Sequence, residues 1–503
     1  MPHAGSLDHL PARRPCRTAR LNPGSRPPSR IWLVVGMMCA AAGVTVVAAE
    51  PHAIVIRGGR VIDPESGLDA VCDLGIDGGT ITAISTTPLV GHHTIPAAGR
   101  VVAPGFIDLH QHAWDDESLA LKVQDGVTSA LELEIGTSDV AEWYRSRVGR
   151  SRLHHGVASG HPPARMAELG DPPAFVPPTQ SRASTVVTTP ELTAAVARRI
   201  ERGLEEGAVA VGFGLAYTPV ASDVEILEAF RVAARHGASC HVHLRARGAA
   251  AALAAAETAR LAAEAGAALH LVHVQATASG PAVDDMLRLV ERFHAGGQDV
   301  TAEVYPWTAG MTDIGSAIFA DGWQERLGVG YGDLQWGGTS ERLTPESFAR
   351  YRATGGLVIV HRDTAASVAA AVAHPLTMVA SDGLIGHPRN AGTSARLLGH
   401  HVRDRGDVTL PTALAKLSLM PARRLEARVE GMRRKGRIGV GADADLVVFD
   451  PGTVAAGATY DRPQAPSVGI EWVIVAGTPV VAGGALVADA FPGRPLRAAH
   501  GTP

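Results

Sequence analysis

The stretch VVAPGFIDLHQHAWDD, Val101–Asp116, decides the fold of this chain. It begins with apolar and β-branched residues, which predict a buried strand over residues 102–110. Side chains along a strand alternate between its two faces, so His110 and His112 are expected to project the same way where the strand ends. Two such imidazoles suit a divalent metal ion. An isolated His-X-His pair is more typical of a polar loop, so ligands from other strands must decide between the two interpretations.

The composition indicates a large globular chain and argues against nucleic acid as a partner. The 503 residues are 46% hydrophobic, which is ample for a large core, and the net charge is −4. No basic field of the kind that nucleic-acid binding requires is present in the sequence. Two of the four cysteines, Cys16 and Cys39, fall in the first 49 residues, so the cysteines imply no disulfide framework.

The first 49 residues are expected to be a targeting segment. A basic, proline-rich stretch precedes the uncharged Ile31–Ala49, which ends with small residues at Val47 and Ala49. This pattern predicts a secretory signal peptide that is cleaved before Glu50, and a periplasmic or secreted mature protein. The alternative is an uncleaved N-terminal anchor, since about 19 apolar residues can span a bilayer. Membrane contact is expected only through this segment.

Two β-rich segments flank a long middle part of the chain. Residues 50–103 and 433–503 contain short alternating runs with Gly-Gly turns, which predict a small β-sandwich built from both chain ends. Residues 104–432 alternate strands with helices, and eight strands predict an α/β fold, a (β/α)8 barrel of the TIM type. Its active site is expected at the C-terminal ends of the strands. The strands are expected at residues 102–110, 128–135, 153–159, 208–215, 239–244, 268–274, 300–305 and 376–380.

Helices and insertions connect these strands. Residues 161–190 contain seven prolines and predict a long loop above the barrel mouth. Residues 307–345 form a second insertion, either a lid or a partner surface, and residues 357–361 are an accessory strand. Helices are expected at residues 191–206, 223–236, 249–265 and 283–295.

The second strand contains two carboxylates on one face, Glu132 and Glu134. A core strand does not tolerate two carboxylates unless they are paired or bind a metal ion. Glu134 lies closer to the C-terminal end and is therefore the preferred ligand, with Glu132 as the alternative. The competing interpretation is an edge strand with exposed glutamates, but the apolar residues around them argue against it.

Strands five, six and eight end in further ligand-type residues. The fifth strand contains His241 and His243, and His243 lies nearer its end; the sixth ends with His273 and the eighth with Asp382. His241 and His270 are interpreted as core histidines, His270 because it is expected on the opposite face from His273. Asp382 precedes a glycine, so taken alone it is typical of a turn.

Ligand-type residues at the same end of five strands together predict a metal centre. Imidazole and carboxylate ligands suit zinc, one or two ions, with a position open to water. A bound metal ion lowers the pKa of water and polarises a carbonyl group. Asp382 is then expected to accept the water proton and donate it to the leaving nitrogen, which is hydrolysis of an amide. The predicted metal ligands are His110, His112, Glu134, His243, His273 and Asp382.

Three further side chains are candidates for binding the substrate. Arg389 follows Asp382 in a loop at the barrel mouth, where a guanidinium can hold a carboxylate with two hydrogen bonds. The alternative is an arginine that only orders the loop. Tyr217 and Tyr305 lie at the ends of the fourth and seventh strands, and each either donates a hydrogen bond to the substrate or packs at the barrel mouth.

The segments PGFIDLHQH, GVTSALELEIG, CHVHLR, YPWTAG and HPRNAGTSARLLG together resemble the amidohydrolase superfamily. Within it they are most similar to the D-aminoacylase and N-acyl-D-glutamate deacylase group, and the resemblance covers most of the chain after residue 53. It implies cleavage of the acyl amide of an N-acyl-D-amino acid, a small-molecule substrate. It also implies that Asp382 is the acid/base, that Arg389 binds the substrate α-carboxylate and that Tyr305 lies in the same pocket. By the same resemblance, the metal-site positions are His110, His112, His243, His273 and Asp382.

Three positions depart from the pattern of this group. Glu134 stands where many D-aminoacylases have a cysteine ligand, and no lysine between Lys122 and Lys416 is available to form a carboxylated lysine ligand. Gln275 replaces a lysine two residues after His273, and Met311 replaces a serine. Both belong to the expected substrate pocket. The resemblance therefore implies the type of reaction but not the identity of the substrate.

Two other functions are compatible with the sequence. One is a different amidohydrolase, such as a cyclic amidase of the dihydroorotase or hydantoinase type, or a dipeptidase. The other is a catalytically silent homologue that acts as a scaffold. The full set of ligand-type residues argues against the silent homologue, which has no need to keep it.

Overall fold

Eight parallel strands form the central sheet of this computed structural model, which describes residues 50–337 and 339–499. Neighbouring strands are parallel throughout, and they follow one another around the sheet in chain order. The strands are β6 (Phe106–Asp108), β7 (Val127–Thr137), β8 (His154–Gly160), β9 (Ala210–Gly214), β10 (Ser239–His243), β11 (Leu269–Leu271), β12 (Val300–Val304) and β16 (Thr377–Val379). The first and last strands meet just beyond their ends, where His112 N donates to Gly383 O at 2.9 Å and Gly383 N to His110 O at 3.2 Å. The predicted α/β barrel is thereby confirmed.

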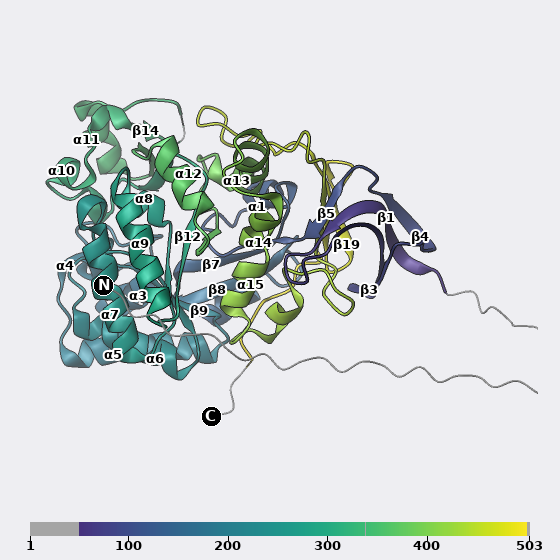
Figure 1. Ribbon diagram of the computed structural model, residues 1–503. Coiled ribbons are helices and arrows are strands. Elements are labelled where there is room, and N and C mark those ends of the chain that lie inside the picture. The colour runs from purple at the N-terminus through teal and green to yellow at the C-terminus, as the bar shows by residue number, and fades with distance from the viewer. Residues whose placement is uncertain (1–49, 338, 500–503) are drawn as a thin grey trace, which may run out of the picture. The chain divides into compact units, whose positions relative to one another are not determined.

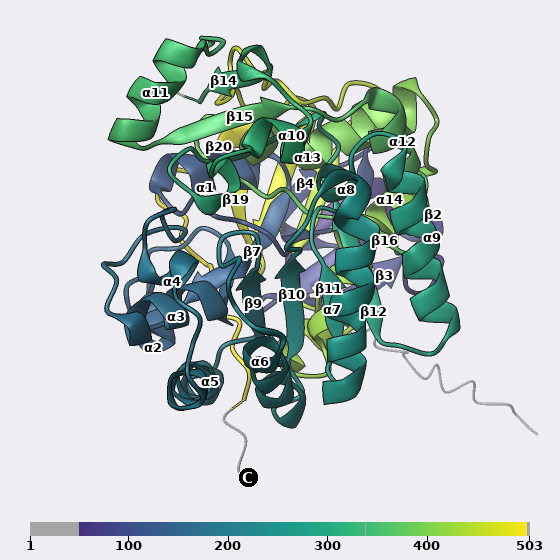
Figure 2. The same ribbon diagram turned by 90° about the vertical axis from the view of Figure 1, so that its left-hand side faces the viewer.

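Helices cover the outside of this barrel (Figure 2). Helix α5 (Pro190–Glu205) begins after Thr189, whose side chain accepts from Leu192 N, and it buries Val196, Ile200 and Leu204, which share one helical face. The other long helices are α1 (Asp116–Gln124), α3 (His161–Leu169), α6 (Asp223–Arg235), α7 (Ala251–Ala265), α9 (Ala282–Ala295), α11 (Pro345–Thr354), α12 (Ala365–Ala373), α13 (Arg389–Arg396) and α14 (Leu410–Leu417). Short helices are α2 (Val140–Arg145), α4 (Arg182–Thr185), α8 (Val274–Ala278), α10 (Trp323–Leu327) and α15 (Leu419–Leu425).

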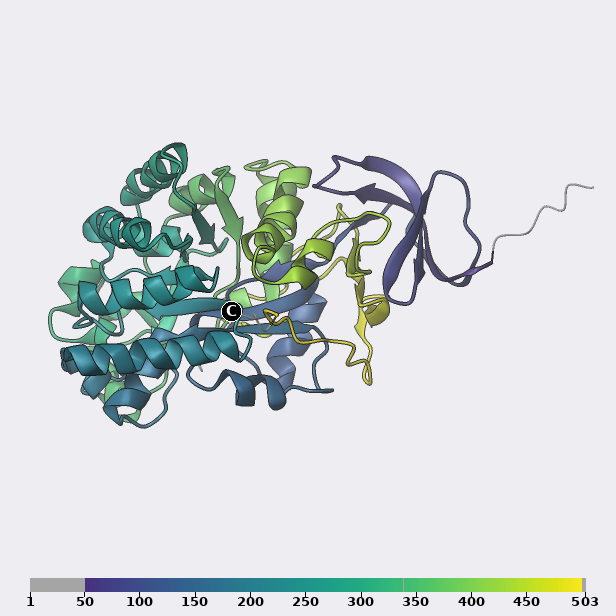
Figure 3. The ribbon, with the colours of Figure 1, turned by 90° about the horizontal axis from the view of Figure 1, so that it is seen from below.

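A nine-stranded sheet combines strands from both ends of the described chain, as predicted (Figures 1 and 3). Its strands are β1 (His52–Ile62), β2 (Asp69–Asp77), β3 (Thr80–Ser85), β4 (Gly91–Pro96), β5 (Val101–Pro104), β17 (Leu446–Phe449), β18 (Ile470–Val475), β19 (Thr478–Ala482) and β20 (Ala485–Leu486). Strand β5 joins the two ends, because it pairs in parallel with β1 and antiparallel with β17. Its Val102 packs in a separate apolar cluster with Ile56 and Val448.

The single strand predicted over residues 102–110 is wrong. The strand is interrupted at Gly105, so that two strands form: β5 belongs to the nine-stranded sheet and β6 to the barrel. Gly105 N donates to Asp445 O at 2.7 Å, and an added Cβ atom would clash with the Thr128 side chain. The same apolar run therefore serves two sheets, which the alternation of side chains alone does not reveal.

The long loop predicted over residues 161–190 is also only partly right. Helix α3 occupies its first third and α4 lies near its end. Proline is tolerated in the first turn of a helix because the N–H groups there have no partner within the helix, so Pro162 and Pro163 begin α3 rather than prevent it. Gly170, with φ 74°, ends the helix in the left-handed conformation.

The second insertion contributes a small sheet outside the barrel. Strands β13 (Ala309–Asp313) and β14 (Leu334–Trp336) both pair antiparallel with β15 (Leu357–His361), the expected accessory strand. Within residues 50–337 and 339–499, no helix has both the length and the apolar character needed to cross a bilayer. The signal peptide or anchor predicted at residues 1–49 lies outside the described residues and stays a prediction.

Gly136 allows β7 to shift its register with β8. Its φ is 69°, and a Cβ atom there would lie 2.5 Å from the Ala158 carbonyl oxygen. Gly136→Ala is therefore expected to lower the free energy of unfolding by more than the roughly 1–2 kcal/mol that the left-handed conformation alone costs. Gly149→Ala is the matched control, because Gly149 has φ 68° with nothing within 4 Å of the added Cβ. Equal losses of stability in urea denaturation would contradict the steric contribution.

Candidate metal centre

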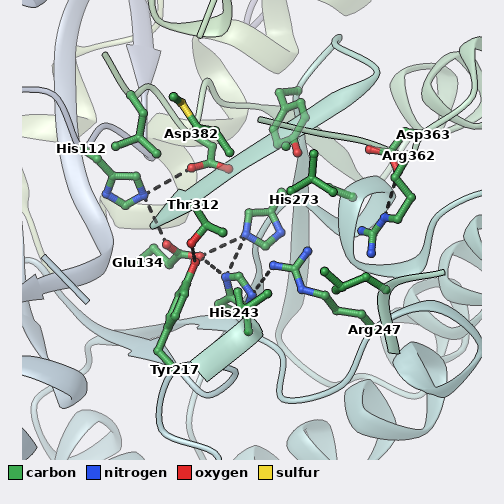
Figure 4. Close-up of a pocket in the computed structure, with 18 of the residues that line it drawn as sticks. His112, Glu134, Tyr217, His243, Arg247, His273, Thr312, Arg362, Asp363 and Asp382 are labelled. Carbon is green, nitrogen blue, oxygen red and sulfur yellow. Dashed lines mark hydrogen bonds and ion pairs between the residues drawn. The ribbon is translucent and has the colours of Figure 1, made fainter. Parts of the chain in front are cut away.

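Ligand-type side chains that lie on or just after four strands meet at the C-terminal end of the barrel (Figure 4). These side chains form two groups of three residues. Within each group the potential ligand atoms lie within 4.8 Å of one another, and Glu134 belongs to both groups. One group is His110, His112 and Glu134, and the other is Glu134, His243 and His273. Glu134 therefore lies where it can bridge two ions or bind one ion from either side.

His110 and His112 converge although neither lies within β6. Their Nε2 atoms are 2.9 Å apart. The other ring nitrogens face carboxylates: His112 Nδ1 lies 2.6 Å from Glu132 Oε2, and His110 Nδ1 forms a hydrogen bond with Glu303 Oε1. Carboxylates at Nδ1 orient metal-binding histidines in just this way and leave Nε2 free for the ion.

The two glutamates of β7 have different surroundings. Glu132 Oε1 accepts from the backbone N–H groups of Ile135 and Gly136 at 3.1 and 3.2 Å, and its other oxygen orients His112. Glu134 Oε1 instead lies 2.6 Å from His243 Nδ1 and 3.0 Å from His273 Nε2. Of the two alternatives, Glu134 is thus placed among the ligand atoms and Glu132 behind them.

His273 and Asp382 both have backbone conformations that are rare for their residue types. His273 has φ 34° between β11 and α8, and Asp382 has φ 51° in the loop after β16. Only two other non-glycine residues among those described, Ser279 and Ala476, have positive φ. Such strain costs about 1–3 kcal/mol and concentrates at functional sites, and here it turns both side chains toward the ligand cluster.

The electrostatics of the cluster favour a bound cation. Burial opposes a charge on His110, yet the carboxylates of Asp382, Glu303 and Glu134 together raise its pKa to about 10. Burial lowers the pKa of His243 to about 3, which keeps that imidazole in the neutral form that binds metals. The surplus of carboxylates and the neutral imidazole both fit a divalent ion.

Asp382 lies between the ligand cluster and Arg389. Its Oδ1 is 3.3 Å from His112 Nε2, and its Oδ2 is 2.9 Å from Arg389 Nη1. Burial works against the charged form, but the Arg389 guanidinium and the histidines lower the pKa of Asp382 well below its usual range. The carboxylate is therefore in the basic form at neutral pH.

Arg389 does not line the cavity in which it was predicted to bind a substrate carboxylate. Its side chain is 0% exposed, its guanidinium stacks 4.8 Å from the Tyr305 ring centroid, and its Nη2 donates to Met311 O at 3.4 Å. Gln275 does not line the cavity either, and its Nε2 donates to Tyr305 O at 3.2 Å. Their predicted contacts with substrate stay predictions.

The cavity lies beside the ligand cluster, and both predicted tyrosines line it. Tyr217 O–H is 3.0 Å from Thr312 Oγ1, and Tyr305 faces the cavity from the residue after β12. The 307–345 insertion supplies part of the wall through Gly310, Met311 and Thr312. Other lining residues include His112, Glu134, Phe175, His243, Arg247, His273, Arg362, Asp363 and Asp382.

Several residues in and around the site were not predicted from the sequence to be functional. Glu303 is a carboxylate in a core strand, the same signal that identified Glu132, and it was overlooked. His270, predicted to be a core histidine, does lie 3.0 Å from Glu303 Oε2, so it orients the carboxylate that orients His110. Arg247 and Arg362 lie in loops, where sequence pattern gives no indication of direction.

The chain is similar to known proteins over most of its length. The amidohydrolase family profile matches residues 93–481. The chain is 32% identical over 482 residues to the N-acyl-D-glutamate deacylase of Alcaligenes xylosoxydans xylosoxydans, covering 85% of this chain and 93% of the relative. It is 30% identical over 487 residues to the D-aminoacylase of that organism, with coverage of 86% and 95%.

A solved structure supports the same relationship. The N-acyl-D-glutamate deacylase from Bordetella bronchiseptica, complexed with zinc and a phosphonate inhibitor, matches with a TM-score of 0.76 and 28% identity, over 89% of this chain and 100% of that chain. The match of sequence and structure spans both the barrel and the metal-ligand residues. The chain therefore belongs to the amidohydrolase family.

Proposed function

We propose that the protein is a zinc-dependent hydrolase that cleaves the amide bond of N-acyl-D-amino acids. The observation that supports this most directly is the pair of His/Glu ligand groups sharing Glu134, with the Asp382 carboxylate 3.3 Å from His112 at the cavity wall. The relatives named above act on N-acylated D-amino acids, and one of them was solved with zinc. A small molecule of this kind is the expected partner.

The ligand residues would be His110, His112, Glu134, His243 and His273, with Asp382 beside them. A zinc ion held there supplies Lewis acidity toward a carbonyl group and acidifies water. The chain's own acid and base is Asp382: its carboxylate accepts one proton from the attacking water and then donates it to the amide nitrogen as the carbon–nitrogen bond breaks. The buried Arg389 guanidinium keeps Asp382 ionised until it accepts that proton.

Other residues of the site orient these groups. Glu303 and Glu132 hold the rings of His110 and His112 through their Nδ1 atoms. Tyr217 and Tyr305 line the cavity, and we expect the hydroxyl group of each to donate a hydrogen bond to an acyl or carboxylate oxygen of the substrate. Burial raises the pKa of both tyrosines above the usual value, so both remain protonated donors at neutral pH.

Metal analysis and a hydrolysis screen of the purified protein test this proposal. We expect stoichiometric zinc, lost on chelation together with activity, and faster hydrolysis of N-acyl-D- than of N-acyl-L-amino acids. Turnover of cyclic ureides or β-aspartyl dipeptides instead would favour the alternative amidohydrolases. A folded protein that binds no metal would favour the silent homologue and overturn the proposal.

A further inference from the structure

Two arginines that the proposed reaction does not use line the part of the cavity away from Asp382. Arg247 lies in the loop after β10, and Arg362 directly follows β15. Figure 4 shows both guanidinium groups on the side of the pocket opposite His112 and Asp382, with Asp363 next to Arg362. This part of the wall is therefore cationic, whereas the metal-ligand part is rich in carboxylates.

The positive charge of this wall is not fully compensated. Arg362 Nε is 3.9 Å from Asp363 Oδ1, and Asp363 Oδ1 also accepts from Ser279 Oγ at 2.8 Å. Burial, followed by the charge of Arg247, lowers the pKa of Arg362 to about 10, so it remains charged at neutral pH. Burial raises the pKa of Asp363. One carboxylate thus faces two guanidinium groups.

Arg247 would lose its hydrogen-bond acceptor, His243 Nε2, if His243 bound a metal ion. Its Nη2 lies 2.6 Å from His243 Nε2, while its Nε is buried without a hydrogen-bond partner. His243 faces Glu134 and His273 with Nδ1, so Nδ1 is the nitrogen available to an ion. A neutral imidazole that binds an ion through Nδ1 has its proton on Nε2, and a guanidinium has donors only. Arg247 then needs another acceptor, and the cavity is the space in front of it.

Arg389, predicted to bind the substrate carboxylate, and Gln275, predicted to lie in the substrate pocket, do not meet this need. Arg389 is fully buried behind Asp382, and Gln275 donates to the Tyr305 carbonyl. The cations that actually reach the cavity are Arg247 and Arg362. Since guanidinium groups bind carboxylates with two parallel hydrogen bonds, a carboxylate is the acceptor that suits them best.

We propose that Arg247 and Arg362 together bind a carboxylate group of the substrate and thereby determine which N-acyl amino acids this protein accepts. This role rests on the proposed function, and it assigns recognition to the loops after β10 and β15 rather than to Arg389. The carboxylate is either the α-carboxylate or an acidic side chain, and both sources offer the same chemistry.

Calorimetric binding to the zinc-loaded Asp382→Asn variant tests the proposal without turnover. Three nearly isosteric probes differ only in charge: N-acetyl-D-glutamate has both carboxylates, N-acetyl-D-glutamine only the α-carboxylate, and N-acetyl-D-isoglutamine only that of the side chain. Arg247→Gln and Arg362→Gln, each added to this background, are expected to weaken N-acetyl-D-glutamate binding by about 10- to 100-fold. Arg247→Lys should recover part of the loss.

The amide probes identify the carboxylate. A loss that disappears with N-acetyl-D-glutamine assigns the arginines to the side chain, and one that disappears with N-acetyl-D-isoglutamine assigns them to the α-carboxylate. Equal losses with all three probes, no loss with any, or no binding of any probe before the arginines are changed would overturn the proposal. Failure of the proposed function is seen separately, as absence of turnover in the unmodified zinc enzyme.

Arg245→Gln is the matched control. This arginine lies in the same loop, but its guanidinium donates to the backbone carbonyls of Pro219 and Ala221 and does not line the cavity. It should leave the preference among the three probes unchanged. A change of preference there equal to that of Arg247→Gln would show that the loop, and not a cavity arginine, determines the preference.

Discussion

Asp382→Asn is expected to lower kcat by about 10²- to 10⁴-fold, the usual contribution of a general acid–base. The asparagine side chain has nearly the same size as that of aspartate, but its amide oxygen is not basic enough to accept a proton from water. Metal binding should survive, because neither of the two three-residue ligand groups includes Asp382. The measurement is steady-state kinetics alongside zinc content for the same preparation.

Asp115→Asn provides the control for this prediction. Asp115 lies close in sequence to His112, caps α1 by accepting from Ser118 N, and does not line the cavity. Asparagine caps helices as well as aspartate does, so the variant should keep full activity. If Asp382→Asn retains near-normal kcat with full zinc, Asp382 is not the base, and the ion pair with Arg389 has another role.

Glu134→Gln is expected to remove most of the bound zinc, because Glu134 is the one residue shared by both ligand groups. An amide is a weaker metal ligand than a carboxylate. In addition, its NH2 group would face the ring nitrogens of His243 and His273, which now lie 2.6 and 3.0 Å from one carboxylate oxygen. Elemental analysis and competition with a chelator measure the change.

Glu132→Gln is the comparison that separates the two glutamates of β7. Glu132 orients His112 and accepts backbone N–H groups, so its loss should weaken zinc binding by about 10- to 100-fold, as for other groups behind metal ligands. Activity should fall accordingly but return at high zinc concentration. Full zinc in Glu134→Gln together with metal loss in Glu132→Gln would reverse the assignment.

The barrel was predictable because its strands are continuous apolar runs bounded by turn residues. The break at Gly105 was overlooked although the sequence marks it, because Pro104-Gly105 between β5 and β6 is a turn-type dipeptide; the two strands then pair with different partners, β17 and β7. Helix α3 was not predicted because its prolines were interpreted as a sign of a loop. A proline interrupts a helix in its middle but is tolerated in its first turn.

The ligand-type residues were predictable for the same reason that core carboxylates are rare: a buried charge needs a partner. That rule, applied consistently, would also have selected Glu303. The direction of Arg389, Arg247 and Arg362 was not predictable, because long side chains in loops are placed by tertiary contacts such as the Arg389–Asp382 ion pair. The left-handed backbone of His273 likewise depends on the turn into α8, not on its residue type.

The sheet shared by the two chain ends sets an order for assembly of the protein during synthesis. Strand β5, which leads directly into the strand before His110, pairs with β17, and Val102 lies opposite Val448 near the other end of the chain. A ribosome makes β17 only after the whole barrel has been translated. The histidines at the beginning of the barrel are therefore among the first ligand residues to be made. The segment that leads to them can pair with β1 at once, but it gains its second partner, β17, only near the end of synthesis.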